Sequence, residues 1–273
     1  MATALYSLLE HNKHLGRIFL ISNESSADRD LLVTTIWEDF GKELEVIHVE
    51  EPKLRLVYTS GHVTEAAYLR FLLGDVLPLA LSTVLYLDSD LVIMGELTAV
   101  LPPEFLISAK ETDSRGWPLI WAVSEHGQEH LAEAGLAGKG YFNSGVMAIN
   151  LLRWRKSGSG EKLFAAEEKH RDALKWWDQD VFNIALSGDW EEMSPLLNGT
   201  VGNRHTESRI IHFNSHRKPW MIGSNRSDWN LYRHYRAKTP FPLPKQEFKL
   251  LAVVKNLAPN WVLNSYKKFS RSK

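Results

Sequence analysis

The sequence predicts an α/β fold in which an open sheet of parallel strands is covered by helices on both faces. Short apolar runs, too short for helices and too hydrophobic for exposed loops, alternate with amphipathic segments. One of these runs, Val84 to Leu87, leads directly into two aspartates. In open α/β sheets, ligands bind at the carboxyl ends of the strands. The segment around 84–87 is therefore predicted to be the central strand and to lead into a ligand site.

Along the first third of the chain, helices and strands are expected in strict alternation. Ala4, Leu5, Leu8 and Leu9 share one face of an amphipathic helix. A later helix ends near Gly74 and leads into the central strand. The expected elements are helices at 2–12, 28–40 and 64–74 and strands at 17–22, 43–49 and 84–87.

The remainder is less regular and ends in a distinct tail. Expected strands lie at 105–107, 120–123, 141–150 and 209–213, and expected helices at 125–137, 151–157 and 160–174. The segment 176–186 is expected to begin as a loop and to continue as a helix. The Pro-rich segment 239–244 reads as a stiff linker. From Lys245 to Lys273 there are seven Lys or Arg residues and one Glu. The interpretation is a domain at 1–238 followed by a linker and a basic helical tail at 239–273.

Composition limits the classes of function. The chain has 273 residues, 44% of them hydrophobic, and a net charge of -1, so no nucleic-acid partner is expected. Cysteine is absent, which excludes disulfides and thiolate metal sites and favours a reducing compartment. No apolar run approaches the roughly 20 residues of a membrane span, so a cytoplasmic protein is expected. Three Asn-x-Ser/Thr triplets, at Asn23, Asn198 and Asn225, are interpreted as chance.

The strand at 84–87 places Asp88 and Asp90 at its carboxyl end. Carboxylates this close can hold a hard divalent cation, which can in turn bind a diphosphate. The Asp-x-Asp pattern also occurs at Asp28/Asp30 and at Asp178/Asp180, where a solvated turn or a helix cap explains it. Only the pair at 88 and 90 follows a strand.

Other polar groups in the second half can complete such a site. His212 ends an apolar strand and can be a third metal ligand, although a histidine there is more often structural. Lys218 can neutralise a phosphate, and Asn143-Ser144-Gly145 places polar groups inside a strand. Asp178 and Gln179 follow a Trp pair, which suits sugar binding or equally a helix N-cap over buried aromatics.

Four segments in order carry a family resemblance: YLDSDLVIMGEL, YFNSGVMAINLLRWR, WWDQDVFNIAL and IIHFNSHRKPW. Together they resemble glycosyltransferase family 8, retaining enzymes that include bacterial lipopolysaccharide galactosyl- and glucosyltransferases. The likeness runs from about Leu5 to Trp220. It implies a GT-A fold with a Rossmann-like nucleotide-binding sheet, a UDP-sugar donor, a saccharide or glycolipid acceptor, and a Mn²⁺ or Mg²⁺ ion.

The resemblance also implies roles for individual residues. Asp88, Asp90 and His212 are expected to bind the metal. Lys218 and Ser215 are expected to contact the diphosphate. Gln179 and Asp178 are expected to face the reacting sugar carbon. The acceptor is expected to attack this carbon from the side that the diphosphate leaves. The remaining expected substrate-binding residues are Arg70, Glu111, Asn143, Ser144 and Gly145. An Asp is usual where Glu111 stands, and a Gly where Ser215 stands.

The chain differs from the family at its start. Family members begin with a strand and a turn just upstream of a helix like the one at 2–12, and this sequence opens inside that helix. The nucleotide-binding sheet is therefore expected to lack its first strand and to show a gap with unpaired strand edges. Two explanations are open, a misassigned start codon and a weak or inactive version, and the first is favoured.

Three alternatives stay open at this point. The basic tail either docks on an anionic inner-membrane surface that carries a lipid-linked acceptor or packs as a solvated helix pair. Asp88 and Asp90 also resemble the nucleophile motif of haloacid dehalogenase-type phosphatases, for which Gly188-Asp189 is a weak match to the required acidic pair. A non-catalytic homologue that binds sugar nucleotides is the third alternative.

Overall fold

The computed structural model describes residues 1–59, 64–106, 116–200, 205–215, 218–221, 227–241 and 243. The strands are β1 (Ile18–Ser22), β2 (Leu44–His48), β3 (Thr83–Leu87), β4 (Leu91–Ile93), β5 (Ile120–Ser124), β6 (Phe142–Asn150), β7 (Trp190–Glu192), β8 (Gly199–Thr200) and β9 (Ile210–His212). The α-helices are α1 (Ala2–His11), α2 (Ala27–Phe40), α3 (Leu73–Val76), α4 (Pro103–Leu106), α6 (Glu129–Glu133), α7 (Leu151–Ser157), α8 (Ser159–His170), α9 (Trp177–Ala185) and α10 (Ser227–Arg236). The 3₁₀ helices are η1 (Pro52–Leu56), η2 (Glu65–Leu72), η3 (Arg171–Ala173) and η4 (Pro195–Leu197).

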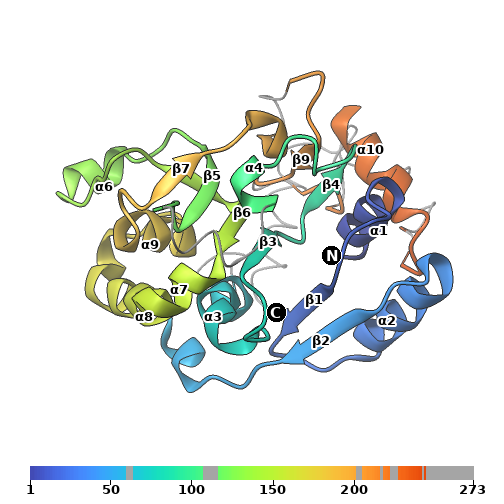
Figure 1. Cartoon of the computed structure of the whole chain (residues 1–273), viewed down its shortest axis with the longest axis horizontal. Coiled ribbons are helices and arrows are strands. Elements are labelled where there is room, and N and C mark those ends of the chain that lie inside the picture. Colours follow the sequence, from blue (N-terminus) through green and yellow to red (C-terminus); the bar gives the residue numbers. More distant parts are fainter. Residues whose placement is uncertain are drawn as a thin grey trace, which may run out of the picture.

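The strands of the described chain form three small sheets. The largest has the order β3-β6-β5-β7, a second pairs β1 with β2, and a third has the order β4-β9-β8. Figure 1 shows β1, β2 and α2 together on one side of the molecule, and β4, β9, α1 and α10 together on another. The connection from β3 to β4 consists only of Asp88, Ser89 and Asp90. This short turn therefore joins the first sheet to the third.

The expectation of an all-parallel sheet is wrong. β1 and β2 are parallel, as a strand-helix-strand unit through α2 requires, but β6 runs antiparallel to both β3 and β5. The segment between β5 and β6 contains only the short helix α6, which does not form a crossover over the sheet. The chain therefore reverses direction at this point, and an antiparallel pair results.

Several elements differ from expectation in kind or length. The helix expected at 64–74 is the 3₁₀ helix η2 followed by α3. Phe105 and Leu106 lie in helix α4 and not in a strand, because Pro103 suits the first position of a helix and cannot donate to a sheet ladder. The helix expected over 125–137 shrinks to α6, which lies between Gly127 (φ 125°) and Gly135 (φ 70°). Glycine adopts such positive φ values readily, so both positions favour turns.

The core lies on both faces of the large sheet. Along β5, Ile120 and Ala122 point into a cluster formed with η2, α7 and α9. Trp121 and Val123 point into a second cluster that includes α1 and β4. This alternation explains why the strand is a continuous apolar run, since neither face meets water.

The expectation that 84–87 is the buried central strand is wrong, because β3 lies at the edge of its sheet and is only partly buried. Among the described residues, β1 pairs only with β2 and β3 only with β6, so each has one edge without a strand beside it. Every residue of both strands is partly exposed, whereas every residue of β6 is buried.

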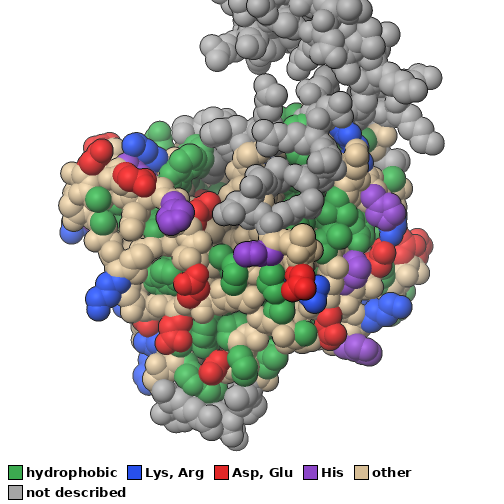
Figure 2. All heavy atoms as spheres, turned by 90° about the horizontal axis from the view of Figure 1, so that it is seen from above, with side chains coloured by type: hydrophobic (Ala, Val, Ile, Leu, Met, Phe, Trp, Pro, Cys, Tyr) green, Lys and Arg blue, Asp and Glu red, His purple; other side chains and the backbone are tan. Residues whose placement is uncertain are grey.

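The basic tail falls almost wholly outside the described residues. Within the described part of the chain, no helix combines the length and the apolar character needed to cross a membrane. On the face seen in Figure 2, both acidic and basic side chains appear on the described surface, the basic ones mainly towards its edges.

Candidate active site

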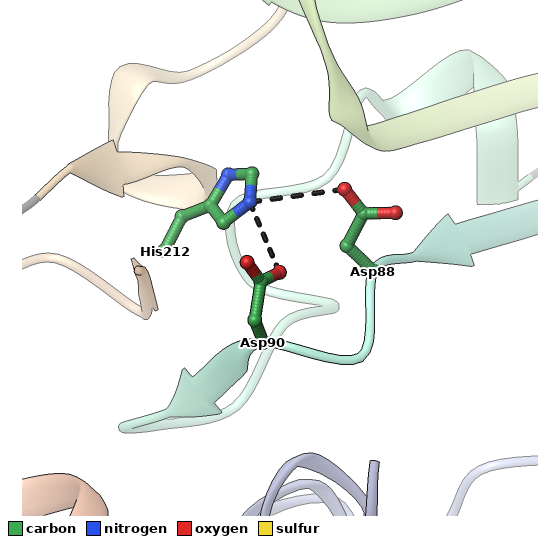
Figure 3. A group of neighbouring side chains, drawn as sticks. All are labelled: Asp88, Asp90 and His212. Atoms are coloured by element: carbon green, nitrogen blue, oxygen red, sulfur yellow. Dashed lines mark ion pairs between the residues drawn. The ribbon is translucent and has the colours of Figure 1, made fainter. Parts of the chain in front are cut away.

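Three potential metal ligands meet where two sheets adjoin. Asp88 follows β3, Asp90 precedes β4, and His212 ends β9. The pairing of β4 with β9 places His212 opposite Leu91 and therefore beside Asp90. His212 Nε2 lies 3.3 Å from Asp90 Oδ1 and 3.7 Å from Asp88 Oδ2. Figure 3 shows the three side chains converging on one point, and one ligand atom from each lies within 4.8 Å of the others.

Gly145 makes room for this cluster. The Asp88 backbone N–H donates to the Gly145 carbonyl at 2.8 Å, which brings β6 against the end of β3. A Cβ atom on Gly145 would lie 2.3 Å from His212 Cε1 and 2.7 Å from Asp88 Oδ2. Any side chain there would occupy the space between the ligands, so the glycine of the Asn-Ser-Gly triplet is a steric requirement.

The charges of the cluster depend on one another. Burial alone would raise the pKa of Asp90, but the opposing influence of His212 and Lys218 is larger and holds that pKa below its usual range. Lys218 Nζ lies 2.6 Å from Asp90 Oδ2 and donates to the Phe213 carbonyl at 2.7 Å. Burial would lower the pKa of His212, but Asp90 and Asp88 raise it overall.

Arg70 fixes the orientation of Asp88. Its buried guanidinium lies on the Tyr86 ring, 4.5 Å from the centroid, and donates to Asp88 Oδ1 at 2.7 Å. The Tyr86 hydroxyl donates to the same oxygen at 2.7 Å. Because both donors use Oδ1, the other carboxylate oxygen is left facing His212.

Arg70 also contacts Ser144 and Asp178. It donates to the Ser144 carbonyl at 2.9 Å and lies 3.2 Å from Asp178 Oδ2. Burial nevertheless raises the pKa of Asp178 to about 6, with Arg70 opposing the effect and the Asp88 charge adding to it. Asp178 therefore carries a proton in a larger fraction of molecules than an exposed aspartate at mildly acidic pH.

A chain of hydrogen bonds determines which nitrogen of His212 faces the acids. The Gly145 backbone N–H donates to Asn143 at 2.9 Å, which identifies the accepting atom as Oδ1. Asn198 Nδ2 donates to that same oxygen at 2.8 Å, so Asn198 presents its own Oδ1 to His212 Nδ1, 3.0 Å away. Nδ1 then carries a hydrogen, so that whenever the ring is neutral its Nε2 lone pair faces Asp88 and Asp90, as a metal ligand requires. The amide of this Asn-x-Thr triplet is buried and engaged in the site.

Gln179 and Glu125 lie on the other side of Asn143. Glu125 Oε2 accepts from Asn143 Nδ2 at 2.8 Å and from Gln179 Nε2 at 3.1 Å. Gln179 Oε1 accepts from the Ser144 backbone N–H at 3.3 Å. A hydrogen-bonded network thus runs from Gln179 through Glu125 and Asn143 to the metal-ligand cluster.

The structure brings together nearly all the predicted site residues that it describes. They are Arg70, Asp88, Asp90, Asn143, Ser144, Gly145, Asp178, Gln179, His212 and Lys218. Ser215 lies two residues beyond Phe213 in the loop after β9 and is half-buried. Glu111 lies outside the described residues.

Sequence analysis missed several residues that contact the site, among them Glu125, Tyr86 and Asn198. Glu125 follows an apolar strand as Asp88 does, and the same end-of-strand signal applies to it, but the surrounding pattern predicted the start of a helix. Tyr86 lies among apolar residues in β3 and carries no polar signal. Asn198 sits in an irregular segment between η4 and β8, where only the three-dimensional structure reveals its partner.

The phosphatase alternative lacks its acidic pair. The Asp189 carbonyl accepts from Leu119 N, just before β5, and its carboxylate pairs with Arg153 at 2.9 Å. β3 and β5 both pair with β6. In these pairings the start of β5 lies level with Thr83 and Val84, at the amino end of β3. Asp189 is therefore at the opposite end of β3 from Asp88.

The chain matches known sequences over most of its length. A family model described as Glycosyl transferase family 8 matches residues 1–222. General stress protein A of Bacillus subtilis is 28% identical over 229 residues, which are 73% of this chain and 74% of that protein. A lipopolysaccharide 1,2-glucosyltransferase of Escherichia coli is 26% identical, covering 88% of this chain and 75% of the enzyme. Glycosyltransferase GlyF of Streptococcus pneumoniae is 24% identical over 85% of this chain, which spans only 58% of GlyF.

Solved structures confirm the predicted fold. The crystal structure of the galactosyltransferase LgtC in complex with donor and acceptor sugar analogues has a TM-score of 0.74 with this chain, at 19% identity, over 90% of this chain and 93% of LgtC. The glycosyltransferase GlyE of Streptococcus pneumoniae gives a TM-score of 0.61 at 22% identity, over 86% of this chain and 56% of GlyE. The fold is the expected GT-A fold.

Proposed function

The chain belongs to glycosyltransferase family 8, and on that premise we propose that it moves a hexose from a UDP-sugar to a saccharide or glycolipid acceptor with retention of anomeric configuration. The convergence of Asp88, Asp90 and His212 beside Arg70, Asp178 and Gln179 supports this proposal most directly. Such a site places cationic and metal-binding groups next to polar groups suited to a sugar.

The donor set fits a divalent metal ion. Two carboxylates and an imidazole suit Mn²⁺ or Mg²⁺, and Gly145 keeps the space between them clear. Asp88 Oδ2, Asp90 and His212 Nε2 are the groups that would hold the ion. When bound there, such an ion would offset negative charge that develops on the departing diphosphate.

The other residues of the site would bind the donor. Lys218, which pairs with Asp90, and the backbone of Ser215 would meet the diphosphate. Arg70, Glu111, Asn143, Ser144 and Gly145 would surround the donor sugar. Gln179 and Asp178 would face its anomeric carbon and stabilise positive charge there, while the leaving phosphate takes the acceptor proton.

The relatives and the tail support proposals for the acceptor and for the location. The similarity to lipopolysaccharide glucosyltransferases supports an acceptor in cell-surface polysaccharide synthesis. The cationic segment 245–273 supports a cytoplasmic enzyme that contacts the inner membrane peripherally and a domain boundary near residue 238. Replacing Lys267 and Lys268 by Glu should weaken sedimentation of the full chain with anionic vesicles, and unchanged sedimentation would count against this contact.

A donor screen tests the proposed function. The protein would be incubated with UDP-glucose, UDP-galactose, UDP-xylose and the N-acetyl forms in the presence of Mn²⁺, and released UDP would be measured. We expect UDP release with one of them and a loss of about 100-fold or more in Asp88→Asn, as expected for removal of a ligand in an electrostatic site. Anomeric analysis of the product tests retention. Binding of UDP-sugar without any hydrolysis or transfer would instead favour the non-catalytic homologue.

A further inference from the structure

A buried hydrogen-bond cluster lies directly behind the side chain of Gln179. At its centre is Asp180, which is fully buried in the first turn of α9. Asp180 Oδ2 accepts from His130 Nε2 at 2.8 Å and from the backbone N–H groups of Lys175 and Trp176, each at 2.7 Å. These bonds tie α6 and the segment before α9 to one carboxylate.

The other carboxylate oxygen of Asp180 accepts the hydrogen bond that the Tyr141 hydroxyl donates. Tyr141 OH lies 2.6 Å from Asp180 Oδ1, and a carboxylate can only accept. Burial and the neighbouring Asp180 raise the pKa of Tyr141, which keeps its hydroxyl protonated. Since a tyrosine hydroxyl has one hydrogen, any other partner of this oxygen must donate to it.

Gln179 is that partner. Its Nε2 lies 3.1 Å from Tyr141 OH and 3.1 Å from Glu125 Oε2. Each N–H of the amide group thus donates to one of these two acceptors, and Oε1 accepts from the Ser144 backbone N–H. The opposite amide orientation would set an oxygen against two acceptors and an NH₂ group against a donor.

We propose that Tyr141, held by Asp180, is a positioning residue that fixes the Gln179 amide with its carbonyl oxygen on the Ser144 side, where Arg70 and Asp178 also lie. The inference rests on the proposed glycosyl transfer. A carbonyl oxygen is the negative end of the amide and favours a developing positive charge on the sugar carbon, whereas an inverted amide would present its positive end. The orientation therefore sets the rate of transfer more than the affinity for the donor.

The Tyr141→Phe variant tests this role, with Tyr6→Phe as a matched control. Tyr6 is also buried and its hydroxyl also donates to a carboxylate, Asp39 Oδ2 at 2.5 Å, but it lies in a separate cluster with α2. We expect kcat to fall about tenfold in Tyr141→Phe, as for loss of one hydrogen bond of ordinary net strength. KM for the donor should change by less than about twofold, and the control should keep both values.

A double-mutant cycle separates positioning from general damage. If Tyr141 acts through Gln179, the Tyr141→Phe substitution has no further effect on kcat in a Gln179→Ala background. An equal loss in both backgrounds, or no loss in the native background, overturns the inference.

The orientation can also be measured without turnover. In ¹H–¹⁵N spectra, the side-chain amide signals of Gln179, assigned by their absence in Gln179→Ala, should exchange faster with solvent in Tyr141→Phe and not in Tyr6→Phe. Unchanged exchange contradicts the inference even in an active enzyme. Failure of all donors in the screen would instead refute the proposed function, and the amide signals would still decide the role of Tyr141.

Discussion

At the scale of single residues, the site depends on hydrogen bonds whose direction is determined by a few groups that can only donate or only accept. The Gly145 backbone N–H orients Asn143, and through it Asn198 and His212. The expectation that His212 adjoins Asp88 and Asp90 is confirmed by their distances. Its dependence on Asn198 was not predictable, because nothing in the sequence near Asn198 signals a partner 14 positions away.

Removal of Asn198 should weaken metal binding. In Asn198→Ala, His212 loses the acceptor for Nδ1, so the ring can rotate or adopt the other tautomer. Outer partners of metal ligands typically contribute about 10- to 100-fold in affinity, and we expect a loss of that size in a Mn²⁺ titration followed by electron paramagnetic resonance. Asn12→Ala removes another buried asparagine, one that binds the Leu97 backbone away from the cluster, and should leave the affinity unchanged. Equal losses in the two variants would contradict the role of Asn198.

The raised pKa of Asp178 predicts a pH-dependent stability in metal-free protein. Between about pH 4 and pH 6 the unfolded chain has lost this proton and the folded protein still holds it, so the free energy of unfolding falls as pH rises. A pKa near 6 corresponds to a decrease of about 3 kcal/mol in the free energy of unfolding across this window, measured relative to Asp178→Asn. Urea unfolding of both proteins at several pH values checks the difference. Parallel pH profiles would show that Asp178 titrates normally.

At the scale of elements, the alternation of strands and helices predicted most of the fold correctly up to β3. Each of those strands has an apolar run bounded by turn residues, and α2 has an N-cap at Ser26 that accepts from the Arg29 backbone N–H. Strand direction was the main error, since a run of buried residues such as β6 has the same composition in a parallel or an antiparallel pair. Direction is determined by the connection, and that connection was wrongly expected to be a long helix.

The position of Gln179 depends on how α9 packs against the core. Phe182 is fully buried, with its ring centroid 5.6 Å from that of Phe71 in η2, 6.0 Å from Trp154 in α7 and 6.4 Å from Phe142 in β6. Phe182→Ala should reduce the free energy of unfolding by about 3–5 kcal/mol, through lost burial and the cavity left behind. Trp37→Ala on α2, where the residue is 62% exposed, should change the free energy of unfolding by less than about 0.5 kcal/mol in the same urea experiment. A small effect at Phe182 would mean that α9 is held by its first turn alone.

At the scale of the whole molecule, the metal-ligand cluster joins parts of the chain that belong to different sheets. Asp88 directly follows β3 of the β3-β6-β5-β7 sheet, whereas His212 belongs to the β4-β9-β8 sheet. The two lie far apart in sequence, and their proximity depends on the pairing of β4 with β9 and on the short connection from β3 to β4. Among the described strands, these two sheets share no ladder, so a cation bound between them would crosslink them.

Metal binding should accordingly stabilise the whole fold and not only the site. A ligand that binds only the folded state adds about 2.7 kcal/mol at a concentration about 100 times its Kd. For a domain of this size that corresponds to a rise in Tm of roughly 5–10 °C, measured by calorimetry with Mn²⁺ against EDTA. Asp90→Asn should lose most of the rise, while the exposed Asp30→Asn on α2 should retain it. Because the cluster spans both sheets, we expect a single cooperative unfolding transition whose Tm rises with Mn²⁺. If the protein instead shows two transitions and the Tm of only one rises, the sheets unfold independently and the ion does not couple them.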